Sequence, residues 1–232
     1  MVLFHYFCIN YSVMIIELGK TNSILNQFIS EVRDVDVQKD KLRFRRNMER
    51  IGEIFAYEIS KELEYVEKDV ITPLGTAHVN VLKKQPLLAT ILRAGLPLHQ
   101  GMLNFFDHAE NAFVSAYRKY HHDEDFDIKL DYISSPSVED SILILCDPML
   151  ATGGSLVAAL KGLLEKGEPR KIHIVSVLAN PVGIENLKKS FSKKKMKIWT
   201  CAIDDELTAK AYIVPGLGDA GDLAYGSKDD TL

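Results

Sequence analysis

Apolar residues in the first quarter of the chain recur at the spacing of amphipathic helices. Within residues 23–63 they fall three or four positions apart, which places them on one face of a helix. Because the pattern is interrupted at residues 34–37, it predicts two helices rather than one. The apolar run that begins at Met14 is typical of an amino-terminal strand, and residues 65–82 alternate around Pro73-Leu74-Gly75, which predicts a β-hairpin.

After the hairpin the pattern changes to short, continuous apolar runs of strand length. Segments with helical spacing separate most of these runs, and the clearest of them follows Ser155. Continuous apolar strands that alternate with amphipathic helices predict a parallel sheet with helices on both faces. Ligands of such sheets bind beyond the carboxyl ends of the strands, so candidate chemistry is expected there. The predicted strands are 87–92, 112–117, 142–146, 172–178 and 198–203, and the predicted helices are 96–106, 155–166 and 182–190.

Composition restricts the class of protein. The chain has 232 residues, of which 47% are hydrophobic and 26% charged, as in an ordinary globular protein. Its net charge of −4 argues against nucleic acid as the main partner, since phosphate neutralisation needs a surplus of Lys and Arg. The three cysteines, Cys8, Cys146 and Cys201, are few and widely separated, which argues against a disulfide framework and for a reducing cytoplasm. Cys146, Cys201 and Trp199 lie in apolar runs and are expected in the core.

The chain has no internal repeat and no linker, so we interpret residues 14–232 as one domain. Residues 1–13 lack the basic start and the cleavage site of a signal peptide, and we expect them to be an upstream extension, with Met14 as the natural start. No apolar stretch of about 18 residues is free of polar interruption, so no membrane-spanning helix is predicted. The expected parts are a helical N-terminal part (14–64), the hairpin (65–82), a core sheet (86–204) and a C-terminal segment (205–226).

The loop after the third predicted strand has the features of an anion-binding site. Gly153 and Gly154 allow the backbone to curl so that several N–H groups point inward, and the start of the following helix adds partial positive charge. Thr152 and Ser155 add hydroxyl donors, and Asp147 at the strand tip can accept hydrogen bonds from vicinal sugar hydroxyls. The loop lacks the lysine of a Walker A motif, so hydrolysis of a nucleoside triphosphate is not indicated. A helix N-cap with a glycine turn is the alternative interpretation.

Segment 147–155 resembles the phosphoribosyl pyrophosphate (PRPP) loop of type I phosphoribosyltransferases, in the form typical of uracil phosphoribosyltransferases. Most of that superfamily has two adjacent acids at the start of the loop, whereas this chain has Asp147 followed by Pro148, the variant of the uracil enzymes. The resemblance implies an α/β fold with a mainly parallel sheet flanked by helices, and a β-hairpin or hood subdomain near the base pocket. The residues implied to bind PRPP in this loop are Asp147, Pro148, Met149, Leu150, Ala151, Thr152, Gly153, Gly154 and Ser155.

Two arginines match further parts of the family pattern. The segment that contains Arg93, Ile91-Leu92-Arg93-Ala94-Gly95, resembles the diphosphate loop. By resemblance Arg93 contacts the diphosphate, a role that suits a planar fork of donors. Arg118 resembles the second PRPP-binding arginine of the family. A surface ion pair is the alternative for each, and it is the stronger alternative for Arg118 because the flanking residues depart from the family pattern.

The glycine-rich segment 212–222 has the features of a base-binding loop. Gly216, Gly218 and Gly221 allow close approach to the backbone. Uracil presents acceptor, donor and acceptor along one edge, and a backbone that offers N–H, C=O and N–H would match it. Cytosine would bring donor against donor, at a cost of about 1–3 kcal/mol. A plain glycine-rich turn is the alternative for such a segment when it stands alone.

This segment resembles the uracil-binding loop of uracil phosphoribosyltransferases almost letter for letter. Asp219 is implied to lie between the base and PRPP and to contact both, which makes it the candidate catalytic base; binding of a ribose hydroxyl or a metal-bound water is its alternative role. The resemblance covers approximately residues 40–226. The residues implied to bind uracil are Ile213, Gly218, Asp219 and Ala220.

The resemblance implies the reaction of uracil with PRPP to give UMP and diphosphate, in pyrimidine salvage. Ribose C1 would gain oxocarbenium character as diphosphate leaves, so positioning and charge stabilisation would dominate catalysis. Mg²⁺ is expected as the cofactor, carried by PRPP, because the sequence contains no all-protein carboxylate cage. Members of the type I family generally pair, so a homodimer or larger assembly is expected.

Two segments have an open role. Residues 119–127 are more acidic than the family's continuation after the second arginine, and a solvated loop is favoured over an altered lid. His121 and His122 have no third ligand nearby and are not interpreted as metal ligands. The basic run within residues 39–50 is typical of a solvent-facing helix surface. The alternatives are that it binds the phosphates of an effector such as GTP, or that it forms a dimer contact.

Two other functions remain beside the uracil enzyme. A pyrimidine-responsive RNA-binding regulator on the same fold would need a basic face and the double-acid loop, and this chain is net negative with Asp147-Pro148. A phosphoribosyltransferase for a purine or for orotate is disfavoured by Gly218-Asp219-Ala220, because other branches build the base pocket differently.

Overall fold

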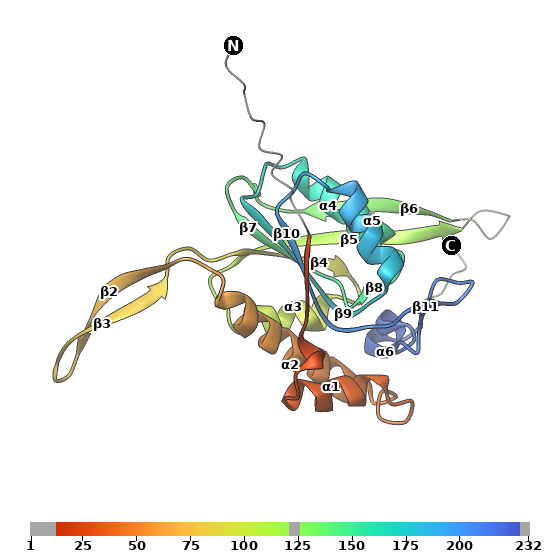
Figure 1. The fold of residues 1–232 in the computed structure, drawn as a ribbon, viewed down its shortest axis with the longest axis horizontal. Helices are drawn as coiled ribbons and strands as arrows, with labels where there is room; N and C mark the ends of the chain where they lie inside the picture. The colour runs from red at the N-terminus through yellow and green to blue at the C-terminus, as the bar shows by residue number, and fades with distance from the viewer. Residues whose placement is uncertain (1–12, 121–125, 228–232) are drawn as a thin grey trace, which may run out of the picture.

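The computed structural model describes residues 13–120 and 126–227, and the side chains of residues 117–129 lie outside this description. Its central sheet consists of β1 (Met14–Glu17), β4 (Leu87–Leu92), β5 (Glu110–Tyr120), β6 (Phe126–Ser134), β7 (Ile142–Cys146), β8 (Met149–Leu150), β9 (Lys171–Ala179) and β10 (Met196–Ile203). The order across the sheet is β1-β10-β9-β7-β4-β5-β6, and β8 pairs with β9 (Figure 1). Every pairing is parallel except that of β5 with β6.

Helices cover both faces of this sheet (Figure 1). They are α1 (Ile24–Arg33), α2 (Lys41–Ser60), α3 (Leu96–Leu103), α4 (Gly154–Leu164), α5 (Pro181–Ser190) and α6 (Ala220–Tyr225), with a 3-10 turn η1 (Leu18–Lys20) after β1. Helices α1, α2, α3 and α6 pack on one face around buried side chains such as Met48 and Phe55. Helices α4 and α5 pack on the other face, where Leu160 and Leu187 are buried. The expected fold class, a mostly parallel sheet flanked by helices, is confirmed.

Local sequence explains where the first two helices begin. The side chain of Ser23 accepts a hydrogen bond from the N–H of Leu25 at 3.2 Å and so caps α1. Asp40 does the same for α2, with 2.9 Å from its Oδ1 to the N–H of Leu42. Between the helices Asp34 caps a tight turn, which is where the hydrophobic spacing is interrupted.

The strands at the middle of the sheet are buried except at an end residue. Every residue of β9 after Lys171 is buried, as a strand covered on both faces requires. Cys146, Cys201 and Trp199 lie in the core, as the sequence predicts, with Cys146 and Cys201 fully buried. Burial raises the pKa of both thiols, which keeps them in the neutral, unreactive form.

The edge of the sheet differs from the sequence prediction. A strand over 112–117 followed by a solvated loop through residue 127 was expected, whereas β5 continues to Tyr120 and turns back into β6, which starts at Phe126. Strand β6 was not predicted, because it is an edge strand with only one covered face and therefore has no continuous apolar run. Residues 121–125, with His121 and His122, lie outside the described residues.

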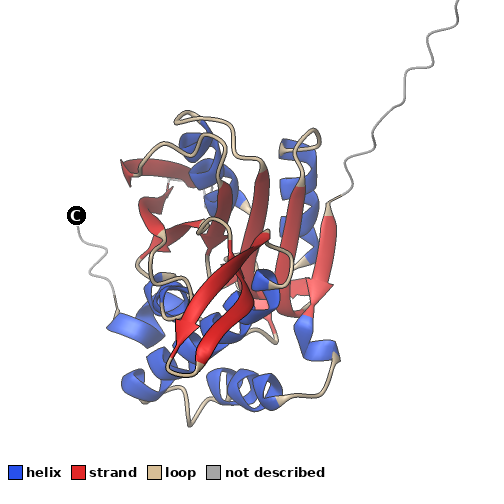
Figure 2. Ribbon diagram, turned by 90° about the vertical axis from the view of Figure 1, so that its left-hand side faces the viewer, coloured by secondary structure: helices blue, strands red, loops and turns tan. Residues whose placement is uncertain are grey.

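The predicted hairpin consists of β2 (Tyr65–Thr72) and β3 (Gly75–Leu82), which pair with each other and project from the body of the protein (Figure 1). In Figure 2 the hairpin lies in front of the body. The sequence interpretation placed it near the base pocket; instead it points away from α6 and the C-terminal segment (Figure 1). Glu62, just before β2, pairs with Lys171 and Lys197 at the amino-terminal ends of β9 and β10. The hairpin therefore leaves from the end of the sheet at which strands β9 and β10 begin, opposite their carboxyl ends.

The N-terminal part is joined to the sheet by β1, which pairs in parallel with β10. Residues 1–12, most of the expected upstream extension, lie outside the described residues. None of the helices in residues 13–120 and 126–227 combines the length and the apolar composition that crossing a bilayer requires.

Candidate functional site

The first half of the loop that follows β7 is held against β9. The N–H of Asp147 donates to the carbonyl of Val175 at 3.0 Å, and the carbonyl of Pro148 accepts from the N–H of Val177 at the same distance. Pro148 and Leu150 are buried, and β8 continues the parallel pairing. The strand tip that carries Asp147 is thus fixed by main-chain hydrogen bonds, at the carboxyl end of the sheet.

The second half of the loop turns into α4 through Gly153, which has a left-handed φ of 81° and precedes the helix as its N-cap. Glycine cannot supply a capping side chain, and the first N–H groups of a helix have no intrahelical acceptor. Gly154 and Ser155 at this helix start are only half-buried. The geometry therefore suits an anion, whose charge would also be stabilised by the helix dipole.

Helix α5 packs against this loop and holds it in place. Asn186 donates from Nδ2 to the carbonyl of Thr152 at 2.9 Å. A Cβ on Gly183 would lie 2.5 Å from the carbonyl oxygen of Ala151 and 3.1 Å from the nitrogen of Gly153, so only glycine lets the helix approach the loop this closely. Neither Gly183 nor Asn186 was predicted from the sequence as a residue of the site.

The segment 91–95, here called the Arg93 loop, lies beside the start of the segment 147–155, here called the Asp147 loop. Strands β4 and β7 are neighbours, with Thr90 opposite Cys146. A Cβ on Gly95 would lie 3.1 Å from the carbonyl oxygen of Cys146, so the two loops begin in direct contact. Arg93 is 40% exposed; its Nη2 donates to the carbonyl of Gly226 at 3.3 Å and lies 3.6 Å from Asp222 Oδ1.

The C-terminal loop is built from a two-stranded unit, β11 (Glu206–Leu207) with β12 (Ile213–Val214), and ends at α6. Ile213 and Ala220 are buried. Gly218 has a left-handed φ of 91°, and nothing lies within 4 Å of the point that a Cβ would occupy. Neither its N–H nor its C=O has a hydrogen-bond partner among the described residues. Gly218 therefore offers its backbone to an open space.

Asp219 is the N-cap of α6. Its Oδ1 accepts from the N–H groups of Gly221 at 2.8 Å and of Asp222 at 3.0 Å. The carboxylate is thus oriented by the backbone that follows it, next to Gly218. The peptide bonds Leu92–Arg93 and Val214–Pro215, in the two loops that lie side by side here, are both cis.

The three loops predicted from sequence converge on one place. A Cβ on Gly221 would lie 3.9 Å from the Cβ of Ala94, and Gly95 packs on Cys146. The Arg93 loop therefore contacts the Asp147 loop on one side and the C-terminal loop on the other. Arg118 lies in β5 opposite Ile128, and its side chain is outside the description.

Polar residues that the sequence analysis missed connect these loops. Asn180, directly after β9, donates its N–H to the carbonyl of Leu150 at 2.8 Å and its Nδ2 to the carbonyl of Asp204 at 2.7 Å. The carboxylate of Asp204, directly after β10, accepts from the N–H of Gly216 at 3.0 Å and is paired with Arg33. The sequence did contain a signal for Asn180 and Asp204, because each is a polar residue just beyond the carboxyl end of a predicted strand.

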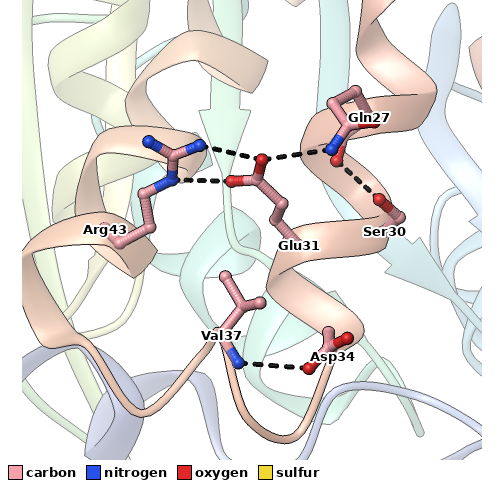
Figure 3. A pocket seen from close by; sticks show the side chains of 6 residues that line it. All are labelled: Gln27, Ser30, Glu31, Asp34, Val37 and Arg43. Carbon is pink, nitrogen blue, oxygen red and sulfur yellow. Dashed lines mark hydrogen bonds and ion pairs between the residues drawn. The ribbon is translucent and has the colours of Figure 1, made fainter.

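A pocket of about 390 Å³ lies elsewhere, between α1 and the start of α2 (Figure 3). Its polar groups bond to one another: Glu31 accepts from Arg43 and Gln27, and Asp34 accepts from the N–H of Val37. The Arg43 hydrogen bond, with those of Asn47 and Gln27, lowers the pKa of Glu31 to about 2. None of the predicted site residues lines this pocket, and both oxygens of its central carboxylate, Glu31, already accept hydrogen bonds from the protein.

Comparisons with known proteins agree with the sequence motifs. A family model described as uracil phosphoribosyltransferase matches residues 20–227, a longer segment than the 40–226 inferred from motifs. The chain is 53% identical to a uracil phosphoribosyltransferase of Porphyromonas gingivalis over 214 residues, which are 92% of this chain and 99% of that protein. It is 37% identical to the one of Thermococcus gammatolerans over 204 residues, 87% and 88% of the two chains. A solved structure of a protein from Aquifex aeolicus superposes with a TM-score of 0.82 at 30% identity, over 93% of this chain and 100% of that one.

Proposed function

Because the chain belongs to the uracil phosphoribosyltransferase family, we propose that it transfers the phosphoribosyl group of PRPP to uracil, giving UMP and diphosphate. The observation that carries this proposal is the position of the Arg93 loop between the other two. Gly95 packs on Cys146, where the Asp147 loop begins, and Ala94 lies against Gly221 in the C-terminal loop. A transfer reaction needs the sugar phosphate, the leaving diphosphate and the base to be adjacent, and this contact pattern supports that arrangement.

The Asp147 loop would bind the ribose 5-phosphate part of PRPP. Main-chain N–H groups at the start of α4 and the hydroxyls of Thr152 and Ser155 are the donors for the phosphate. Asp147, fixed at the strand tip, would accept hydrogen bonds from the ribose hydroxyls. The remaining loop residues proposed to line the PRPP site are Pro148, Met149, Leu150, Ala151, Gly153 and Gly154.

Arg93 would bind the diphosphate. In this structure its guanidinium contacts the carbonyl of Gly226 and the carboxylate of Asp222, and these contacts would be exchanged for diphosphate oxygens when PRPP binds. A guanidinium is suited to the two linked phosphate groups of the diphosphate because it offers several donors in one plane. We propose Arg118 as the second PRPP-binding arginine, on the strength of the family resemblance.

The C-terminal loop would bind uracil. The unpartnered backbone of Gly218 and the open space beside it support recognition of the flat base by main-chain groups, together with Ile213 and Ala220. Asp219, oriented by its capping hydrogen bonds, would lie between base and ribose and is the proposed catalytic residue. In the proposed step uracil N1 bonds to ribose C1, the bond from C1 to the diphosphate oxygen breaks, and the N1 proton is lost, with Asp219 as its candidate acceptor. The protein's contribution would mainly be to position both reactants and to stabilise charge.

Mg²⁺ is the proposed cofactor and would arrive bound to PRPP. Within the described part of the chain, the one group of three metal-ligating side chains is Glu67, Asp69 and His78 on the hairpin, away from the three loops. Asp147 and the loop hydroxyls are oxygen ligands of the kind Mg²⁺ accepts, beside the oxygens that PRPP itself would supply. Bound Mg²⁺ would neutralise charge on the leaving diphosphate.

We propose that the protein acts as a homodimer or larger assembly. Only Leu82, at the end of the hairpin, packs against the core. The rest of the hairpin carries several exposed apolar side chains, which are Val66, Val70, Ile71 and Val79 on the strands and Leu74 in the turn. Such a surface is unusual for a monomer and fits a second copy. Ile71→Glu should shift the protein toward monomer in light scattering, and Ile24→Glu, at an exposed apolar residue of α1, should not. Equal masses for both variants and the wild type would contradict this surface.

An effector site for GTP has little support from the basic run. Each of its four arginines already contacts another group of the protein. The contacts are Arg43 with Glu31, Arg45 with the carbonyl of Ala224, Arg46 with Glu49, and Arg50 with Asn47. Separately, the two buried free thiols, Cys146 and Cys201, fit the proposed location in a reducing cytoplasm.

The proposed function is tested by diphosphate release from PRPP with uracil, cytosine, orotate, hypoxanthine or xanthine as acceptor. Release with uracil alone, with UMP as the product, is expected. Release with a purine or with orotate would assign the chain to another base. No release with any base, together with UMP-dependent RNA binding, would support the regulator instead.

A further inference from the structure

The last residue of α1 forms a paired hydrogen bond with a carboxylate from the other end of the chain. Arg33 donates from Nη1 and Nη2 to the two oxygens of Asp204, at 2.7 and 2.8 Å. The side chain of Asp204 is 8% exposed and that of Arg33 is 22% exposed. A two-pronged guanidinium–carboxylate pair fixes orientation as well as distance, so the end of α1 and the end of β10 are held in one geometry.

This pair holds one residue of the C-terminal loop by both of its main-chain groups. The N–H of Gly216 donates to Asp204 Oδ2 at 3.0 Å, and its carbonyl accepts from Arg33 Nη1 at 3.0 Å. Gly216 has a left-handed φ of 58°, and a Cβ there would overlap the carbonyl of Ile213. The loop is therefore clamped two residues before Gly218, whose backbone faces the open space.

The charge state of Asp204 supports this arrangement. Burial by itself raises the pKa of the carboxyl, but the hydrogen bonds from Arg33 and from the N–H of Gly216 lower it by more, so the net pKa lies below the ordinary value. The carboxylate is thus ionised at neutral pH and accepts all of these hydrogen bonds at once.

The same residue is linked to the Asp147 loop. The carbonyl of Asp204 accepts from Asn180 Nδ2 at 2.7 Å, and the N–H of Asn180 donates to the carbonyl of Leu150 at 2.8 Å. Asp204 therefore connects to one loop through its side chain and to the other through its main chain. Two hydrogen bonds separate Leu150 in the first loop from the residue that clamps Gly216 in the second.

We propose that Arg33 and Asp204 are positioning residues that set the distance between the base loop and the PRPP loop, and thereby the affinity and selectivity for the pyrimidine. This inference rests on the proposed function, because it takes the C-terminal loop as the base site. Neither residue needs to touch substrate. Their effect acts through Gly216 on Gly218, and it is specific for the base rather than for PRPP.

Asp204→Asn is the sharpest test, since it keeps the size of the side chain and replaces one acceptor oxygen by an NH₂ that meets a donor. We expect KM for uracil to rise about tenfold, the effect of one buried donor losing its partner. KM for PRPP should change less than about twofold, and the ratio of uracil to cytosine use should fall. Arg33→Lys, which keeps the charge but offers a single prong, should show a smaller change in the same direction and serves if Asp204→Asn does not fold.

The pair formed by Arg43 and Glu31 provides a matched control. It is also a two-pronged pair between α1 and a second element, with distances of 2.7 and 2.8 Å, but it makes no contact with a substrate loop. Glu31→Gln should leave both KM values and the base selectivity unchanged. If Asp204→Asn lowers only the melting temperature and leaves KM for uracil within twofold, as Glu31→Gln should, the residue is merely structural and the inference is wrong.

Hydrogen exchange of the ligand-free protein separates this inference from the proposed function. In Asp204→Asn and in Arg33→Lys, amides of residues 213–221 should exchange at least about tenfold faster than in the wild type and in Glu31→Gln. Unchanged exchange of this segment would refute the clamp whichever base the enzyme uses. Faster exchange in a protein that proves to use another base would retain the clamp and reject uracil.

Discussion

Replacing Gly183 by alanine should impair the use of PRPP even though alanine is the better residue for a helix. Gly183 is the third residue of α5, and alanine in a helix interior is favoured over glycine by about 1 kcal/mol. The new Cβ, however, would lie 2.5 Å from the carbonyl oxygen of Ala151, where ordinary contact starts at 3.4 Å, a deficit of about 0.9 Å. It would also lie 3.1 Å from the nitrogen of Gly153. Both neighbours are backbone of the Asp147 loop, so the loop has to move.

The size of the effect follows from that displacement. A misplacement of about 1 Å in a substrate-positioning element can cost about 100-fold in rate. We therefore expect kcat/KM for PRPP to fall roughly 10- to 100-fold, which corresponds to about 1.4–2.7 kcal/mol of transition-state stabilisation. Initial rates at varied PRPP and saturating uracil measure this value, and a melting curve shows whether the variant is folded.

Gly162→Ala is the matched control, because it places the same methyl group in α4, the helix that starts at this loop. The new Cβ would overlap Ile133 Cδ1 and lie 2.9 Å from Leu130 Cδ2, and both are ends of side chains that can rotate away. Its kcat/KM for PRPP should stay within about twofold of the wild type. A folded Gly183→Ala variant with equally normal kinetics would refute the claim that α5 determines the position of the loop.

Three further predictions concern single residues of the sites described above. Asp147→Asn should lower kcat/KM for PRPP at least about 100-fold with an unchanged circular dichroism spectrum, because the ribose hydroxyls lose a charged acceptor; near wild-type kinetics would remove Asp147 from the site. Gly218→Ala should raise KM for uracil about tenfold and leave KM for PRPP unchanged, since its methyl would enter the open space where the base is proposed to bind; an unchanged KM for uracil would place the base elsewhere. Burial lowers the pKa of His173 from 6.5 to about 3, so the unfolded chain binds more protons than the folded one below pH 6.5, and stability should fall by about 2 kcal/mol between pH 7 and pH 5 on account of this residue. His173→Gln, which can still accept the hydrogen bond from Trp199, should reduce the pH dependence in urea denaturation by that amount, and an identical dependence in both proteins would show that His173 does not stay neutral.

The sequence predicted the candidate loops well because their conformations depend on neighbours a few positions away. Gly153 and Gly218 do have the left-handed φ that only glycine adopts freely, as expected of glycine-rich loops after a strand. The strands and helices on either side follow from periodicity, which reports which face is buried. Because periodicity depends on burial, strand β6 was missed: an edge strand with one covered face leaves a weaker hydrophobic pattern in the sequence.

What the chain determines by itself is thus local: the run of strands and helices, the glycine positions, and the types of side chain at the strand ends. Which loops meet was decided by the tertiary structure. Arg33 and Asp204 are 171 positions apart, and many other arginines and acids of the chain could in principle have paired; the packing of α1 against the sheet selects this pair. The contact of Gly183 with Ala151 likewise exists only because α5 packs beneath the loop. Hydrogen bonds and close contacts between distant residues act over a few ångströms, so their partners are known only once the whole sheet and its helices have brought them together.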